Sequence, residues 1–218
     1  MAKIRSVDEL DGLIDHETVW RKVELSTSLK LIQQASGPAQ VASIRAGVLV
    51  LYAHWEGWIK AISQLYVRYV NTQKFSYDSL SEAFLGNALK TKLTALADAS
   101  AAHVHTDFAS LIVNRLGERA TVSENLVRTE SNLSSKVLLD IVDRLGLEKH
   151  SEYTLRANLI DRELVGRRNS IAHGEFLELK PEEFRVLRTT ILELLELFTD
   201  DVRKAASNGT HLRAPEVH

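Results

Sequence analysis

The residues best suited to chemistry lie in one stretch of the chain, Asp161-Arg-Glu-Leu-Val-Gly-Arg-Arg-Asn-Ser-Ile-Ala-His173-Gly. Read as a helix, the stretch places Asn169 and His173 on one face, because residues four apart are neighbours. Histidine titrates near neutrality and suits proton transfer. Arginine stays charged and can hydrogen-bond two phosphate oxygens at once. The sequence therefore brings a proton-transfer group and an anion-binding group together at Arg168 to His173.

Arg168 falls inside the apolar stripe of this helix, whose members are Ile160, Leu164, Val165, Ile171 and Ala172. Burying an unpaired guanidinium is costly, so an arginine there needs a partner or a purpose. Two other readings stay open: the helix ends and Arg168 is merely exposed, or Arg168 pairs with an acidic neighbour. Gly166 lies one turn before Asn169 and removes side-chain bulk, which would let another group approach closely.

The elements that must position this stretch are predicted to be helical. Ser6 and Glu9 form an S-x-x-E capping box, which predicts a helix from there to about Ser36. Gly37-Pro38 then ends that helix, because proline disfavours helix in the residue before it. The last helix is expected to start at Pro181.

The clearest element is a long helix over 38–74, in which apolar residues recur at alternating spacings of three and four. At ~1.5 Å per residue it would be roughly 55 Å long. Such an a/d seam is typical of the spine of a bundle or of a dimer interface, and helices of the same chain could equally fill it. Trp55 and Trp58 lie on the seam and are expected in the core. Its members are Val41, Ile44, Val48, Leu51, Trp55, Trp58, Ile62, Leu65 and Tyr69.

Shorter helices are expected over 80–102, around 108–116, over 134–145 and from Tyr153 into the RRNSIAHG stretch. The stretch 118–132 has weak periodicity and is predicted to be a long loop. Strand signals are almost absent, so the predicted class is all-α, a helical bundle with a long central helix. Residues 1–206 are predicted to form a single helical domain, and 207–218 a flexible C-terminal tail.

The composition excludes several classes of protein. Lys and Arg total 27 and Asp and Glu total 29, a net charge of −2, so any nucleic-acid site must be a local basic patch. The chain has no cysteine, which excludes disulfides, thiol catalysis and cysteine metal sites. His103-x-His105 has no carboxylate cluster nearby, so no metal and no cofactor are predicted. The sequence shows no signal peptide and no membrane span, and the expected location is the cytoplasm.

Arg168-Asn169-x-x-x-His173 resembles the R-x(4–6)-H motif of the HEPN superfamily in its R-N-x-x-x-H form, and the following Gly174 fits. The segments LVLYAHWEGWIK (49–60) and ESNLSSKVLLDIVDRLGL (130–147) are similar to segments of bacterial stand-alone HEPN-like nucleases. The resemblance covers roughly 41–198. It implies an all-α bundle that forms a homodimer and places two such motifs beside each other.

The resemblance also implies an activity, that of a metal-independent endoribonuclease acting as a toxin or antiphage-defence effector. In such a reaction a base deprotonates the 2′-hydroxyl of RNA, which attacks the adjacent phosphate. His173 would be the acid or base, Arg168 would stabilise phosphate charge, and Asn169 would orient the imidazole or bind phosphate. RNA is the expected substrate because DNA lacks the 2′-hydroxyl. An antitoxin or another defence-system protein is an expected partner.

Four further side chains are candidates for substrate binding. Arg162 and Arg167 lie on the motif helix and would belong to a basic patch, the alternative being an ordinary mixed-charge surface. Glu56 and Lys60 are an i,i+4 pair that is either a surface pair or reaches the catalytic cleft.

Glu175 stands where HEPN toxins regulated by tyrosine modification have a tyrosine, so regulation would follow another route. The alternative function is a non-catalytic HEPN-like helical partner subunit, because some superfamily members bind nucleotides or proteins.

Overall fold

The computed structural model describes residues 3–124, 132–176 and 178–214. Helices dominate these residues, and two isolated bridges, Ser76 with Arg119 and Leu80 with Leu212, lie outside any strand. The predicted all-α class is confirmed. In the described part of the chain, no helix is both long and apolar enough to cross a membrane.

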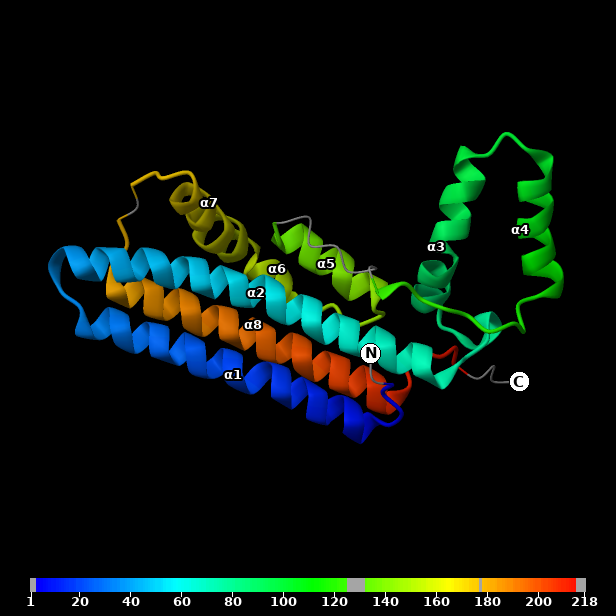
Figure 1. The fold of residues 1–218 in the computed structure, drawn as a ribbon, viewed down its shortest axis with the longest axis horizontal. Coiled ribbons are helices and arrows are strands. Elements are labelled where there is room, and N and C mark those ends of the chain that lie inside the picture. The colour runs from blue at the N-terminus through cyan, green and yellow to red at the C-terminus, as the bar shows by residue number, and fades with distance from the viewer. Residues whose placement is uncertain (1–2, 125–131, 177, 215–218) are drawn as a thin grey trace.

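Three long helices pack side by side and form the body of the molecule (Figure 1). They are α1 (Val7–Gln34), α2 (Gly37–Gln73) and α8 (Pro181–Asn208). The predicted cap of α1 is half confirmed, because the Ser6 hydroxyl accepts from the Glu9 N–H at 3.1 Å. The Glu9 carboxylate accepts from the Arg5 N–H at 2.7 Å instead of from Ser6, so its half of the box is displaced by one residue.

The seam of α2 is buried against its own chain. Val48, Leu51, Trp55 and Ile62 are wholly buried, whereas Val41 at the start of the seam is 43% exposed. The core position of both tryptophans is confirmed, and each indole N–H is satisfied: that of Trp55 donates to the Leu133 carbonyl at 2.8 Å and that of Trp58 to Thr199 Oγ1 at 2.9 Å. The seam therefore builds the monomer core and gives no support of its own to a dimer.

Smaller elements complete the fold. The short turn η1 (Tyr77–Ser79) leads into α3 (Glu82–Asp98) and α4 (Ala102–Asn114), which form a hairpin projecting from one end of the body (Figure 1). Towards the other end, a second layer covers α2 and α8. It consists of α5 (Ser135–Arg144), α6 (Ser151–Leu155), the π-helix η3 (Leu159–Gly166) and α7 (Arg167–Ala172).

The predicted tail over 207–218 is wrong for the described residues 207–214, and 215–218 lie outside the described residues. α8 continues to Asn208, and His211 is only 2% exposed. Its ring packs among four aromatic rings at centroid distances of 5.4 to 6.2 Å, those of Tyr66, Tyr69, Phe75 and Phe84. The polar composition of the segment gave no sign that His211 is buried or that the backbone of 211–213 bonds to residues 79–81.

Candidate active site

The motif stretch begins as a π-helix and continues directly into α7. Gly166 lies at the junction, where an added Cβ would meet the Asp161 carbonyl oxygen at 3.3 Å. The close approach expected at Gly166 is therefore made by the backbone of its own turn and not by an outside group. π-turns inside helices are frequent at functional sites.

Gly174 ends α7 and places His173 at the helix terminus. Its φ is +78°, a left-handed conformation that glycine adopts without strain. The Glu175 N–H donates to the Ser170 carbonyl at 2.9 Å and the Gly174 N–H to the Ile171 carbonyl at 3.1 Å, which is a Schellman motif. His173 is the capping residue of this motif, and its side chain is exposed.

Arg168 lies over the buried aromatic ring of Tyr52 on α2. Its guanidinium carbon is 4.2 Å from the ring centroid, and its Nη1 donates to Asn169 Oδ1 at 2.7 Å. This answers the question that the apolar stripe raised: the helix continues, and the arginine has a partner. A guanidinium stacked on a ring keeps its charge and its remaining donors in a defined plane.

Tyr52 is the residue that the sequence interpretation missed. It is 3% exposed, and its hydroxyl accepts from the Leu133 N–H at 2.9 Å. The pKa of Tyr52 is raised to about 12, chiefly by burial and also by the hydrogen bond to Glu56, while the Leu133 N–H and the Arg168 charge act in the opposite direction. The available signal was the i,i+4 pair of Tyr52 and Glu56 on α2, which places both on one face.

Glu56 forms a hydrogen bond with the hydroxyl of Tyr52, on whose ring Arg168 lies. The amide oxygen of Asn169 accepts from Arg168, and the Asn169 side chain forms no hydrogen bond with the imidazole of His173. His173 is linked to Asn169 through the backbone only, from its N–H to the Asn169 carbonyl at 3.0 Å. No described residue forms a hydrogen bond or an ion pair with the His173 side chain. We call Tyr52, Arg168, Asn169 and His173 the motif site.

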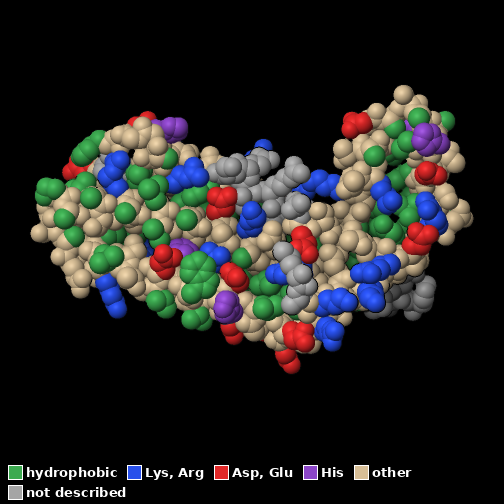
Figure 2. Space-filling view, in the orientation of Figure 1, with side chains coloured by type: hydrophobic (Ala, Val, Ile, Leu, Met, Phe, Trp, Pro, Cys, Tyr) green, Lys and Arg blue, Asp and Glu red, His purple; other side chains and the backbone are tan. Residues whose placement is uncertain are grey.

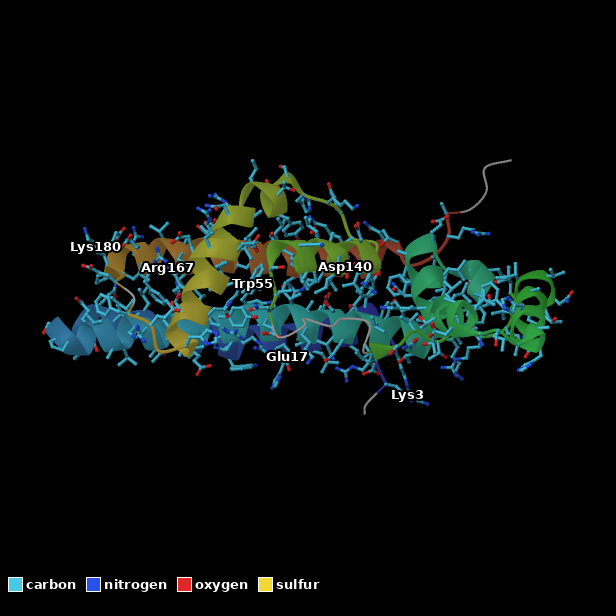
Figure 3. The ribbon with its side chains drawn as sticks, turned by 90° about the horizontal axis from the view of Figure 1, so that it is seen from above. Lys3, Glu17, Trp55, Asp140, Arg167 and Lys180 are labelled. Atoms are coloured by element: carbon cyan, nitrogen blue, oxygen red, sulfur yellow. The ribbon has the colours of Figure 1, made fainter. Side chains whose placement is uncertain are left out.

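The other predicted substrate-binding residues are more dispersed. Arg167 forms an ion pair with Glu163 and, together with residues of α8, lines a pocket of about 280 Å³. Figure 3 shows Arg167 on the segment that crosses over the long helices. Arg162 and Lys60 are both exposed. Among the described residues, no hydrogen bond or ion pair joins these three to the motif site.

Two contacts outside the motif hold it in place. Asp161 accepts from both the backbone N–H and the hydroxyl of Ser135, at 2.7 and 2.6 Å, and so ties η3 to the first turn of α5. Arg45 of α2 donates to the Glu175 carbonyl at 2.6 Å, just beyond His173. Both ends of the motif segment are therefore fixed to neighbouring helices.

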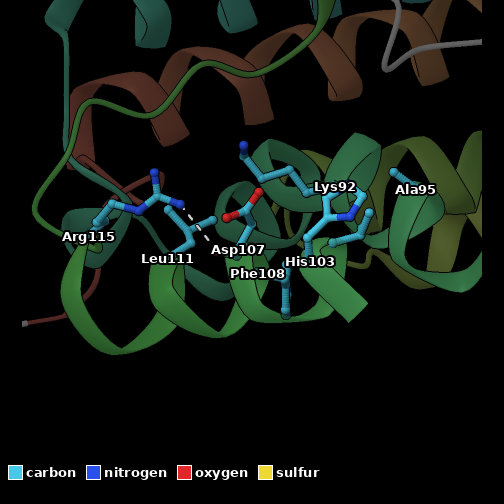
Figure 4. A pocket seen from close by; sticks show the side chains of 8 residues that line it. Lys92, Ala95, His103, Asp107, Phe108, Leu111 and Arg115 are labelled. Carbon is cyan, nitrogen blue, oxygen red and sulfur yellow. Dashed lines mark hydrogen bonds between the residues drawn. The ribbon is translucent and has the colours of Figure 1, made fainter. Parts of the chain in front are cut away.

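A separate hollow of about 390 Å³ lies between α3 and α4, and Lys92, His103 and Asp107 are among the side chains around it (Figure 4). It belongs to the projecting hairpin and contains no residue of the motif site. Within the described ranges, no group of three or more histidine, aspartate and glutamate side chains could hold a metal ion.

Comparison with known families finds a match, which covers most of the chain. Residues 12–211 match a family model described as MAE_28990-like HEPN. The chain belongs to the HEPN superfamily. The match covers most of the chain, from α1 through the end of α8, so the HEPN fold includes all three long helices as well as the segment that carries the motif. No curated protein and no solved structure matches the chain.

Proposed function

We propose that this HEPN protein is a metal-independent endoribonuclease. The observation that carries the proposal is the arrangement at the end of α7: a stacked, charged arginine and an exposed histidine lie on one short helix that is fixed at both ends. The superfamily as a whole is associated with ribonucleases, which agrees with these residue types.

In the proposed reaction His173 takes the proton from a 2′-hydroxyl, and the resulting oxygen attacks the adjacent phosphorus. The bond from phosphorus to the 5′-oxygen of the next nucleotide breaks, and that oxygen takes up the proton that His173 now carries. Arg168 stabilises the charge that develops on the phosphate oxygens. Asn169 and Tyr52 act through Arg168, because they fix the direction of its guanidinium. The products are a 2′,3′-cyclic phosphate and a 5′-hydroxyl.

Each chain supplies a single Arg168 and a single His173, and a site that pairs the arginine of one chain with the histidine of the other would explain how such a short motif suffices. We therefore propose a homodimer with two motif sites side by side. We further propose that the enzyme acts in the cytoplasm as a toxin or antiphage effector, and that an antitoxin or another partner protein controls it. Mixing Arg168→Ala and His173→Ala subunits tests the homodimer: recovery of cleavage in mixed dimers supports sites that draw residues from both chains.

The decisive experiment for the activity is cleavage of RNA in excess EDTA, with analysis of the new ends. We expect wild-type protein to leave 2′,3′-cyclic phosphates without added metal, and His173→Ala to leave RNA intact. Activity that EDTA abolishes and magnesium restores would contradict the metal-independent mechanism.

One observation favours a second function, that of a non-catalytic partner subunit. Arg168 already has partners inside the chain, so a purely structural role for it is consistent with its contacts. Undiminished cleavage by His173→Ala, or no cleavage by the wild type on any RNA, would favour this second function.

A further inference from the structure

A basic surface lies away from the motif site, where α2 ends. A cleft of about 350 Å³ is lined there by four cationic residues and one carboxylate, namely Lys3, Arg68, Lys74, Arg119 and Glu124. In the space-filling view, Lys and Arg side chains gather at the end of the body below the hairpin (Figure 2). The chain as a whole carries a net charge of −2, so this local excess of positive charge is a departure from the average. We call it the basic cleft.

Three of the four cations of the basic cleft are exposed to solvent. Lys3, Lys74 and Arg119 are exposed, and none of the three forms an ion pair with a described residue. By contrast, Arg167 on the motif helix is paired with Glu163. Like charges held close together repel, so such a cluster costs stability unless an anion occupies it.

The walls of the basic cleft are held in place by hydrogen bonds to backbone groups. The Asn71 side chain donates to the Val122 carbonyl at 2.8 Å and accepts from the Val122 N–H at 2.9 Å. The Ala120 N–H donates to the Phe75 carbonyl at 2.9 Å, and Arg119 Nη2 donates to the Asn71 carbonyl at 3.2 Å. These bonds fix the segment around Arg119 against the end of α2, so the charges are positioned before any ligand arrives.

Lys74 has an unusual backbone that supports a role for its side chain. Its φ is +63°, and within the described ranges it is the one residue other than glycine with a positive φ. A helix end of this kind normally uses glycine, because other residues are strained there by roughly 1 kcal/mol or more. The chain tolerates this strain at a position that places a lysine in the basic cleft.

Helix geometry connects the basic cleft to the motif site. On α2 the positions Glu56, Lys60, Gln64 and Arg68 are four apart and form one row along the surface. The row begins one turn after Tyr52 and ends in the basic cleft, about 24 Å along the helix axis from Tyr52 to Arg68. Lys60, a predicted substrate contact without a partner at the motif site, is exposed midway along this row.

We propose that the basic cleft binds phosphate groups of the RNA substrate, so that the strand follows the α2 row between the cleft and the motif site. The proposal rests on the proposed ribonuclease function for the identity of its ligand. Phosphates are the ligand chemistry that four clustered cations select, and an RNA strand is the source long enough to reach both places.

The test measures RNA binding separately from cleavage. Lys3→Gln, Lys74→Gln and Arg119→Gln are combined in one variant on a His173→Ala background, so that RNA is bound without being cut. A matched control combines Lys30→Gln, Lys90→Gln and Lys204→Gln, three exposed lysines elsewhere that form no ion pair with a described residue, with the same change in net charge. Fluorescence anisotropy gives the Kd of a labelled single strand of about 20 nucleotides at several salt concentrations, because phosphate contacts show in the salt dependence.

We expect the cleft variant to bind this RNA more weakly and to lose about 2 from the slope of log Kd against log salt, at ~0.7 per phosphate contact in a single strand. The control should keep the wild-type slope. Equal slopes for the two variants would overturn the proposal. Binding of tripolyphosphate is measured for the same two variants. If the cleft variant loses tripolyphosphate binding while its RNA binding is unchanged, the proposal is also overturned, because the cleft would then bind a free phosphate compound.

The outcome is separable from that of the proposed function. A slope change in a protein that cleaves no RNA leaves the basic cleft as an RNA site and removes the nuclease. If the wild type cleaves RNA but the two variants have equal slopes, the nuclease function stands and the basic cleft is not an RNA site.

Discussion

Two regions of the chain combine a histidine, a tyrosine and a charged side chain, but they differ in access. At the motif site the guanidinium lies on Tyr52 and His173 is exposed. Between α6 and α8, Asp201 accepts from His150 Nε2 and from the Tyr153 hydroxyl, both at 2.9 Å, and its own side chain is 2% exposed. We call His150, Tyr153 and Asp201 the Asp201 cluster.

This difference in solvent exposure distinguishes side chains that stabilise the fold from side chains that can bind a ligand. In the Asp201 cluster burial raises the pKa of Tyr153 well above its ordinary value, and both carboxylate oxygens are used. Such a cluster fixes α6 against α8 and so supports the segment that leads into η3. At the motif site the positions of Arg168 and Asn169 are fixed, while the imidazole remains open to solvent.

The largest expected effect concerns His173. If it moves protons, His173→Ala lowers the cleavage rate by roughly 10²–10⁴-fold and leaves RNA affinity and thermal stability near wild type. Arg168→Lys should also lose rate, because an ammonium cannot replace the planar fork of the guanidinium. Single-turnover cleavage and melting curves check both variants. A large loss of stability in His173→Ala would contradict the comparison, because His173 would then hold the fold as the Asp201 cluster does.

The second effect concerns stability at the Asp201 cluster. Asp201→Ala leaves the buried hydroxyl of Tyr153 without its acceptor and should destabilise the fold by about 3 kcal/mol, or about 10 °C in Tm. The exposed neighbour gives a matched control, Asp200→Ala, with little expected change. Calorimetry measures both. Cleavage per folded molecule should stay near wild type in Asp201→Ala, and a selective loss of rate would place the cluster in the mechanism.

The third effect concerns the ring beneath Arg168. Tyr52→Leu removes the stacking surface and should lower the cleavage rate by about 2- to 30-fold, from a cation–π energy of ~0.5–2 kcal/mol. Tyr52→Phe keeps the ring and should keep the rate, but it should lose stability because the Leu133 N–H loses its acceptor. Equal rate losses in the two variants would assign the effect to the hydroxyl.

The smallest expected effect is a pH dependence of stability, and it concerns two buried histidines, His54 and His211. Burial lowers the pKa of His54 and of His211 below 6.5, so near that pH the unfolded chain binds more protons than the folded chain. The free energy of unfolding should therefore be highest above about pH 7 and should decrease as the pH drops through about 6.5. Urea unfolding at about pH 7.5 and 5.5 measures the loss, and His54→Asn with His211→Asn should flatten it. The exposed-site control His103→Asn should keep the wild-type dependence.

Local patterns in the sequence determined most of the helices and the residues of the motif. The spacing of apolar residues located α2, and Gly37-Pro38 located the break between α1 and α2, because periodicity and helix-breaking residues act only on near neighbours in the chain. For the same reason Arg168 was recognised as a side chain that needs a partner. The all-α class followed from the same local signals together with the near absence of strand patterns.

The tertiary structure alone decided which distant residues meet. Arg168 lies on Tyr52 across 116 positions of sequence, His211 docks among aromatic rings from α2 and α3, and Arg119 joins Lys3 and Lys74 in one cleft. No periodic pattern encodes such contacts, because they depend on how helices pack against one another. The sequence thus determined what chemistry the chain carries, and packing decided that Arg168 is held by a buried ring while His173 stays open to solvent.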